Sequence, residues 1–126
     1  MILRTYKELK VWQKAFAWCK QAYELTKTFP KEEIYGLTSQ MRRAAVSIPS
    51  HIAEGYGRKT TREYLKGLYM YIACGSLGEL ETQLMLAREL NFIKTEEANN
   101  TNDVIEDLER MLKALMRKRE DKTAEK

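Results

Sequence analysis

The residues of this chain best suited to chemistry are basic side chains, and they are concentrated in one segment. Between positions 42 and 66 the sequence has six basic and two acidic residues, so the segment sums to +4 (six minus two), equal to the formal net charge of the whole chain. Cations beside the exposed N–H groups of a helix start bind phosphate, and the neighbouring Tyr56 and Tyr64 offer rings on which a nucleobase can stack. The residues predicted to contact phosphate are Arg43, Arg58, Lys59, Arg62 and Lys66. A solvated basic rim without a ligand is the alternative that charge alone leaves open.

Glu79 is the second residue whose position indicates an interaction. In a helical projection it falls on the side shared by the apolar Leu68 and Ile72, where a lone carboxylate is unfavourable. An ion pair with Arg42 or Arg43 would compensate this carboxylate, either inside the fold or between subunits. An arginine in such a pair would not be available to nucleic acid. Arg43 is therefore predicted either to contact phosphate or to pair with Glu79. A catalytic acid is the alternative, but no second carboxylate or histidine has suitable spacing to share the chemistry.

The remaining nucleophiles and bases do not form a recognisable catalytic or metal site. Ser47 and Ser50 stand near His51, the single histidine, but no strand-turn-helix elbow or orienting acid accompanies them. A lone histidine on the flank of an apolar helical stripe is typical of a hydrogen-bonded packing residue. Cys19 and Cys74 are isolated, so neither a disulfide framework nor a zinc site is expected. We therefore expect no enzyme activity, no cofactor or metal, and no small-molecule substrate.

Long helices must position these residues, and the first is predicted from about Tyr6 to Phe29. A seam of alternating three- and four-residue steps contains Leu9, Trp12, Phe16, Cys19, Tyr23 and Thr26. On nearly the opposite side, Val11, Trp18 and Leu25 repeat every seven residues. One helix of a monomeric bundle needs only one buried face, so this second row predicts a contact between subunits. The alternative is that Trp18 packs within its own chain.

The second helix is predicted from Tyr35 to Glu54, after Pro30 has ended the first. Its apolar residues fall within one stripe of about 100°. They are Leu37, Met41, Ala44, Ala45, Ile48 and Ile52. Pro49 lies inside the helix, so we expect a kink or a local break near residues 45–48.

The third helix is predicted from the capping box at residues 60–63 to Leu90. Apolar residues on most of its sides predict that it is the most buried helix. Gly75 and Gly78 lower its helix propensity by about 1 kcal/mol each, which favours close approach of a neighbouring backbone there.

Asn91 is expected to end the third helix, and the fourth is predicted most clearly from Asp103 to Arg117. Residues 119–126 are almost wholly polar, which predicts a disordered tail after a single domain of residues 1–118. Short connections between long amphipathic helices predict an all-α, antiparallel up-and-down four-helix bundle. The sequence lacks a signal peptide and any run of roughly 18 apolar residues, so we expect a soluble, cytoplasmic protein with no membrane partner.

Several blocks of the sequence together resemble a known family. The blocks lie between about Tyr6 and Leu115, and they are Leu9-Lys10-Val11-Trp12, Tyr35-Gly36-Leu37, Gln40-Met41-Arg42-Arg43-Ala44-Ala45, Ile52-Ala53-Glu54-Gly55 and Gly75-Ser76-Leu77-Gly78-Glu79-Leu80-Glu81-Thr82-Gln83-Leu84. The chain resembles the bacterial four-helix-bundle proteins first noticed as reading frames inside intervening sequences of large-subunit ribosomal RNA genes. That family includes the accessory variability protein of diversity-generating retroelements.

The resemblance implies a four-helix bundle that assembles into a ring-like homopentamer. In the retroelement branch it also implies a basic surface that engages RNA or DNA and a partner reverse transcriptase. At the position of His51 the family pattern usually has asparagine, so an imidazole must replace the hydrogen bonds of that amide.

We therefore predict a non-enzymatic homo-oligomer, most simply a pentamer, that binds RNA rather than DNA through phosphates with little base selectivity. The second hypothesis is an oligomeric scaffold that docks a protein partner, such as a reverse transcriptase, without touching nucleic acid itself. Turnover that is lost in His51→Ala without loss of folding would instead indicate an enzyme.

Overall fold

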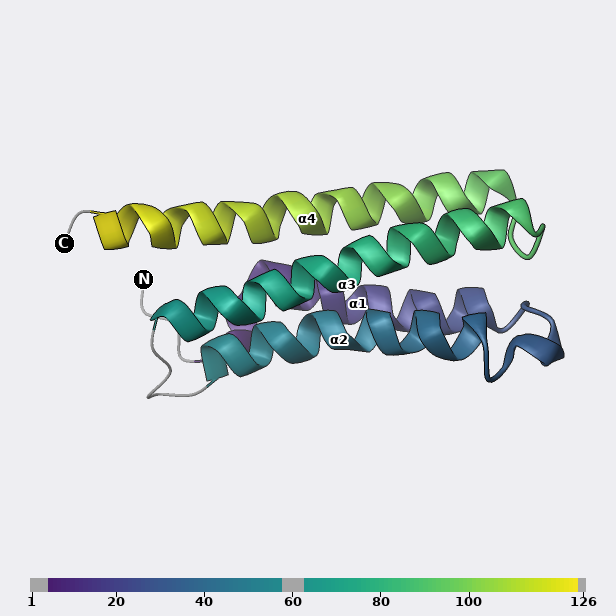
Figure 1. Cartoon of the computed structure of the whole chain (residues 1–126), viewed down its shortest axis with the longest axis horizontal. Coiled ribbons are helices and arrows are strands. Elements are labelled where there is room, and N and C mark those ends of the chain that lie inside the picture. Colours follow the sequence, from purple (N-terminus) through teal and green to yellow (C-terminus); the bar gives the residue numbers. More distant parts are fainter. Residues whose placement is uncertain (1–4, 58–62, 125–126) are drawn as a thin grey trace.

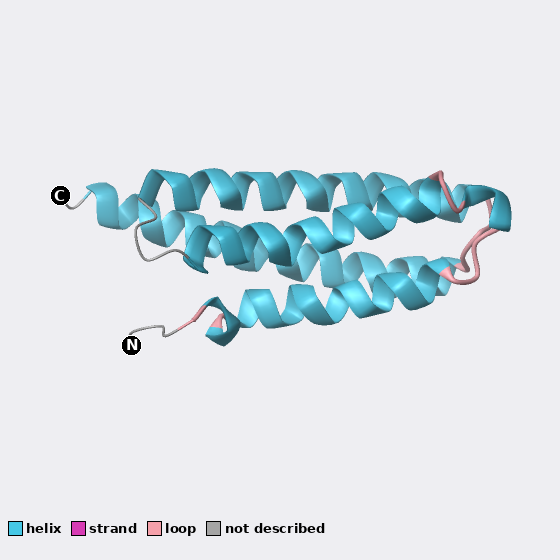
Figure 2. Ribbon diagram, turned by 90° about the horizontal axis from the view of Figure 1, so that it is seen from below, coloured by secondary structure: helices cyan, strands magenta, loops and turns pink. Residues whose placement is uncertain are grey.

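The computed structural model describes residues 5–57 and 63–124, with side chains described for residues 5–56 and 66–117. It contains four long helices: α1 (Lys10–Thr26), α2 (Leu37–Gly57), α3 (Glu63–Glu89) and α4 (Thr95–Ala124). Two short 3₁₀ helices, η1 (Tyr6–Glu8) and η2 (Lys31–Glu33), precede α1 and α2. The described ranges contain no strand, which confirms the predicted all-α class (Figure 2).

The helices form an up-and-down bundle in which each helix packs against the next one in the chain (Figure 1). α1 and α4 close the bundle, joined by an ion pair of 3.0 Å between Lys14 and Asp107. The C-terminal end of α2 and the N-terminal ends of α1 and α3 therefore lie at one end of the bundle, together with the last turns of α4 (Figure 1). The predicted four-helix bundle agrees with this arrangement.

The core receives side chains from all four helices. Its largest fully buried members are Trp18, Met41, Ile48, Ile52, Met70, Leu77, Leu80, Ile105, Leu108 and Leu112. Every residue of the stripe predicted for α2 is buried, because that helix lies between α1 and α3. The 3.6-residue period of α2 thus identified its core-facing side correctly.

The row of α1 that was predicted to contact another subunit lies in the core of the chain itself. Val11 and Trp18 are only 3% and 2% exposed, and Leu25 is half-buried against the core. The interface assignment of this row is therefore wrong for Val11 and Trp18. The physical reason is that Ala15 and Ala22 complete the row at helical spacing, and their small side chains let α1 pack closely beside the indole.

The other apolar row of α1 is the one that reaches the surface. The ring of Phe16 stacks on that of Trp12 with 5.1 Å between centroids, and Phe16 is 47% exposed. Tyr23 lies two turns further along the same side and is 43% exposed. Of the aromatic residues of α1, Trp18 lies in the core, whereas Phe16 and Tyr23 are exposed.

α2 is continuous from Leu37 to Gly57, so the local break predicted near residues 45–48 is not formed. Pro49 lacks the N–H that would bond the carbonyl of Ala45, but that carbonyl finds a donor in α1. The neighbouring helix thus supplies the hydrogen-bond donor that the internal proline removes.

Gly75 and Gly78 of α3 do not meet a neighbouring helix within the chain. Gly75 and Gly78 are exposed, and a Cβ atom built on either would have nothing within 4 Å. The close approach is found at Gly55 of α2, where a Cβ would lie 3.2 Å from that of Tyr69. α3 also exposes several large apolar side chains, so the prediction that it is the most buried helix is wrong.

The turn between α3 and α4 has the predicted end at Asn91, which adopts a positive φ of 62°. The N–H of Phe92 bonds the carbonyl of Ala87 at 2.8 Å and that of Asn91 bonds Arg88 at 3.0 Å, the pattern of a Schellman motif. α4 then runs to Ala124, so most of the segment predicted as a tail is helical. Its arginine, lysine and glutamate residues are good helix formers. No helix in the described part of the chain is both long and apolar enough to cross a membrane.

Candidate nucleic-acid interface

The predicted phosphate-binding residues cluster in sequence around the connection between α2 and α3. Arg58, Lys59 and Arg62 lie outside the described residues, as does most of the predicted capping box, so the structure gives no positions for them. Lys66 lies in the first turns of α3. Arg43 lies 14 residues before the end of α2, which corresponds to about 21 Å of helix, so it does not join the same cluster.

Lys66 is held against α2 at this end. Its ammonium lies over the ring of Tyr56, 5.2 Å from the centroid, which is the geometry of a cation–π interaction. The two helices come close here because Gly55 has no side chain, and a Cβ at that position would lie 3.6 Å from the Cα of Lys66. One face of the Tyr56 ring, which was predicted to stack a base, therefore already carries a cation. The contact fixes a positive charge near the start of α3.

The fold brings two further basic segments to this end of the bundle. Lys10, at the start of α1, shares an apolar hollow of about 300 Å³ with α4, whose lining residues are Leu9, Lys10, Val11, Met111, Ala114 and Leu115. From position 113 onward, α4 contains five basic residues (Lys113, Arg117, Lys118, Arg119 and Lys122) and two acidic ones (Glu120 and Asp121). We call this region the basic end, and its described basic residues are Lys7, Lys10, Lys66, Lys113 and Arg117.

Sequence reasoning missed the contribution of α4 because the end of the predicted fourth helix was not placed beside the other basic segments, and residues 119–126 were treated as a tail. The available signal was the up-and-down topology itself, since an even number of helices returns the C-terminal helix to the end where the first helix begins. Not all of these cations are equivalent. Lys113 forms an ion pair with Glu109 at 2.8 Å, and the hydrogen bond to that carboxylate raises the pKa of the Lys113 ammonium. Arg117 is exposed.

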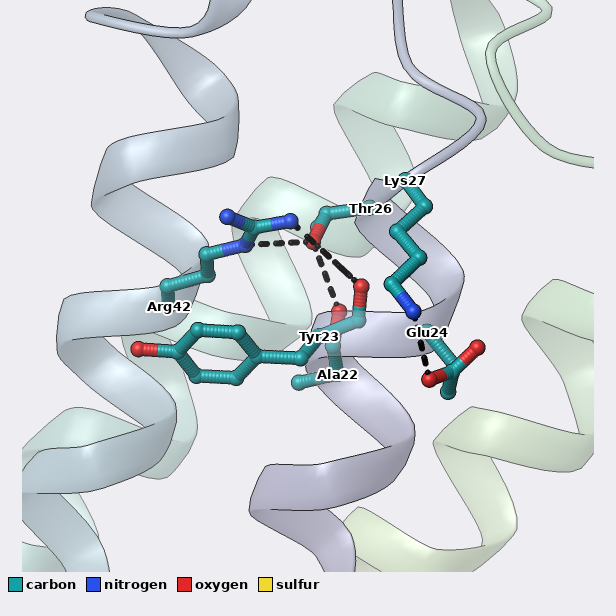
Figure 3. Close-up of polar contacts among 6 residues, drawn as sticks. All are labelled: Ala22, Tyr23, Glu24, Thr26, Lys27 and Arg42. Atoms are coloured by element: carbon teal, nitrogen blue, oxygen red, sulfur yellow. Dashed lines mark hydrogen bonds and ion pairs between the residues drawn. The ribbon is translucent and has the colours of Figure 1, made fainter.

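Arg42 forms its contacts within the chain, as Figure 3 shows. Its Nε donates to Oγ1 of Thr26 at 2.8 Å, and one terminal nitrogen donates to the carbonyl of Tyr23 at 3.5 Å. The guanidinium also lies 4.6 Å from the centroid of the Tyr23 ring. These contacts join α2 to α1. They occupy the arginine that was predicted as one partner of Glu79.

The predicted ion pair of Glu79 is not formed within the described part of the chain. Glu79 is exposed on α3, and among the described residues no ion pair links it to Arg42 or Arg43. The expectation of a buried carboxylate was wrong because Leu68 and Ile72, which share its side of α3, are exposed as well. A pair between subunits stays a prediction.

A hollow of about 400 Å³ lies where α1, the η2–α2 connection and α2 meet. Its lining consists of Tyr23, Ile34, Thr38, Ser39, Arg42, Arg43 and Val46. Two of these residues are arginines and none is acidic, so the hollow is electropositive. It is far from the basic end along the bundle axis and cannot belong to the same contact surface.

His51 has the packing role that was predicted for it. Its Nδ1 lies 2.7 Å from the carbonyl oxygen of Ser47 and 2.9 Å from the Ser47 hydroxyl, which in turn lies 2.8 Å from the hydroxyl of Ser76. The imidazole ring also packs against Tyr69, 6.2 Å between centroids. This chain of contacts joins α2 to α3 and contains no carboxylate. Nowhere in the described part of the structure do three or more His, Cys, Asp or Glu side chains gather into a metal site.

Comparison with known proteins gives one family. The family model described as 23S rRNA-intervening sequence protein matches residues 7–114. This range includes all of α1, α2 and α3 and most of α4. No curated protein matches the chain.

Proposed function

The chain belongs to the 23S rRNA-intervening sequence protein family, and from this premise we propose that it is an oligomeric, non-enzymatic accessory protein that binds nucleic acid at its basic end. The observation that carries the proposal is the position of the charge. The end of α2 and the start of α3, which flank the basic segment in sequence, lie at the same end of the bundle as the start of α1 and the last turns of α4 (Figure 1).

Such a surface suits the phosphate backbone rather than base edges. Lysine and arginine contacts to phosphate supply sequence-independent affinity through counterion release. Among the described side chains at this end, the ring of Tyr56, which could stack a base, already packs against the ammonium of Lys66. We propose RNA in preference to DNA, because the family name associates its members with 23S ribosomal RNA.

A non-enzymatic role agrees with the state of the nucleophiles and bases that are described. The hydroxyl of Ser47 is within hydrogen-bond distance of both the imidazole of His51 and the hydroxyl of Ser76. Cys19 is a hydrogen-bond donor whose burial raises its pKa to about 11, so it is not a thiolate near neutral pH. The proposal requires no cofactor, metal or small-molecule substrate.

The alternative proposal is an oligomeric scaffold that docks another protein, such as a reverse transcriptase in the retroelement branch of the family. The exposed apolar side chains of α3 and of the α1–α2 side favour this alternative. In that case nucleic acid would reach the complex through the partner. Co-purification that survives nuclease treatment, combined with no RNA affinity of the isolated protein, would favour the scaffold.

The proposal is tested by reversing charge at the basic end. In the variant Arg58→Glu/Arg62→Glu, affinity for a short structured RNA should fall by roughly tenfold to a hundredfold near 0.1 M salt, since two phosphate contacts are lost. Fluorescence anisotropy at several salt concentrations measures the change. The matched control, Lys27→Glu/Lys31→Glu, makes the same change of net charge at the opposite end, where both residues are exposed. Equal losses in both variants, or a salt-independent affinity, would refute binding at the basic end.

A further inference from the structure

An apolar hollow lies between the start of α1 and α4, within the basic end. It has a volume of about 300 Å³, and its lining residues are Leu9, Lys10, Val11, Met111, Ala114 and Leu115. Val11 is buried, and Leu9, Met111 and Leu115 are half-buried against the hydrophobic core, so the walls of the hollow are fixed by the fold. A hollow of this volume is at the lower end of the range for small-molecule sites and is large enough for one ring system. We call it the α1–α4 hollow.

The charges around the α1–α4 hollow are positive. Lys10 lines it and is exposed, and a lysine at such a rim places its apolar stem against the lining and its ammonium in water. Arg117, also exposed, is three residues after Ala114 and therefore on the same face of α4. The carboxylate of Asp107, further along α4, is already paired with Lys14 at 3.0 Å. The hollow therefore suits a ligand that joins an apolar ring to adjacent negative charges.

A second hollow between α1 and α4 provides a comparison within the same molecule. It has a volume of about 480 Å³, and its lining residues are Lys20, Gln21, Glu24, Leu25, Glu97, Asn100, Thr101 and Val104. Two of these residues carry carboxylates, whereas no acidic residue is among those that line the α1–α4 hollow. A polyanion is therefore repelled at the second hollow and attracted at the first, although the second is the larger.

We propose that the α1–α4 hollow receives one unpaired base of a bound RNA, while Lys10 and Arg117 contact the neighbouring phosphates. Bases in loops and bulges are unstacked and can be splayed out into a protein, whereas the bases of a duplex cannot. The thioether of Met111 also favours contact with an aromatic ring. Because every base has a flat apolar face, such a contact adds affinity with little selectivity among bases. This inference rests on the proposed function and names the part of the RNA that the basic end recognises.

The contribution of a buried base differs from that of a phosphate contact in its dependence on salt. Phosphate contacts weaken as salt rises, because fewer counterions are released on binding. Burial of an apolar ring follows the surface removed from water and involves no counterion. The two contributions can therefore be measured separately in one protein.

Two hairpin RNAs that differ in a single base provide the test. One has a bulged adenosine, and the other has an abasic ribose at the same position, so the number of phosphates is equal. The wild-type protein should bind the first RNA about threefold to tenfold more tightly, because burial of the base removes apolar surface from water. Fluorescence anisotropy should show that both affinities fall between about 0.1 M and 0.3 M salt while their ratio is unchanged.

A substitution that fills the hollow assigns the base to it. Ala114 is exposed, so Ala114→Phe should keep the fold and the net charge while its ring occupies the hollow. This variant should bind both RNAs with the affinity that the wild type has for the abasic one. That retained affinity, together with unchanged far-UV circular dichroism, shows that the variant is folded. Asn100→Phe, at an exposed position that lines the second hollow, is the matched control and should keep the wild-type preference.

The outcomes distinguish this inference from the proposed function. Equal affinity of the wild type for the two hairpins overturns the inference and leaves nucleic-acid binding intact, and it is the result expected if the hollow instead holds an apolar side chain of a protein partner. A preference that persists in Ala114→Phe, or that is lost to the same extent in Asn100→Phe, also overturns the inference. A wild-type protein with no affinity for either hairpin refutes the proposed function and this inference with it.

Discussion

The thiol of Cys19 in α1 donates a hydrogen bond to the carbonyl oxygen of Ala45 in α2, with 3.1 Å between sulfur and oxygen. In an uninterrupted helix this carbonyl would accept the N–H of residue 49, which is proline here. The thiol thus supplies the donor that Pro49 removes. A buried, unpaired carbonyl is unfavourable, so this contact explains how α2 tolerates a proline at its centre.

Removing the thiol should therefore destabilise the fold. In Cys19→Ala the Ala45 carbonyl loses its donor and a small cavity remains, which should lower the free energy of unfolding by about 1–3 kcal/mol. Cys19→Ser keeps a donor and should retain part of that stability. Urea unfolding followed by circular dichroism measures both. Restoring the backbone donor with Pro49→Ala should reduce the effect of Cys19→Ala, and an unchanged effect in that background would show that the bond is not the cause.

The same thiol should make stability depend on pH in the alkaline range. Burial raises the pKa of Cys19 from its ordinary 9.0 to about 11, so the folded state holds a proton that the unfolded state releases between these values. Its stabilising contribution is complete below pH 9 and is lost as pH rises toward 11. Lysine and tyrosine residues titrate in the same range, so the comparison is with Cys19→Ser. The stability difference between the two proteins should shrink as pH rises from 8.5 to about 10.5, and a constant difference would contradict the assignment.

The two apolar rows of α1 should respond very differently to truncation. Trp18 is 2% exposed, so Trp18→Ala should lower the free energy of unfolding by about 3–5 kcal/mol. Phe16 is 47% exposed, so Phe16→Ala should cost the single chain about 1 kcal/mol or less. Denaturant unfolding at low protein concentration measures the difference. A larger loss in Phe16→Ala than in Trp18→Ala would contradict the burial of Trp18 and support the prediction that its row contacts another chain.

These rows also show where sequence reasoning succeeds and where it fails. The periodicity of α2 identified its buried stripe because both neighbouring helices cover one contiguous side. In α1 both sides carry large apolar residues, and hydrophobicity alone could not rank Trp12 and Phe16 against Val11 and Trp18. The small side chains of Ala15 and Ala22 determine which side of α1 is buried, because they let the neighbouring helix approach closely. That approach is not visible in the sequence of α1 alone.

The candidate site was predictable in its charge but not in its extent. Lys66 and the basic residues beside it follow directly from local composition. The contributions of Lys10 and Arg117 depend on contacts between α1 and α4. These two residues are more than a hundred positions apart in the sequence. The position of Glu79 was predicted from the apolar residues around it, but these face outward, and no single-chain pattern distinguishes an apolar core face from an apolar docking face.

The contribution of α1 and α4 to the basic end leads to a final prediction. In Lys10→Glu/Arg117→Glu both substitutions are at exposed positions, so the fold should be retained while affinity for a short structured RNA falls. The slope of the logarithm of the binding constant against the logarithm of salt concentration should become shallower by about 1.5, since each lost phosphate contact accounts for roughly 0.7–0.9. Lys113→Glu should have a smaller effect than Arg117→Glu, because Lys113 already pairs with Glu109. Lys27→Glu/Lys31→Glu is again the control at the opposite end of the bundle. If RNA affinity is unchanged in Lys10→Glu/Arg117→Glu but falls in Arg58→Glu/Arg62→Glu, the RNA contact is confined to the connection between α2 and α3.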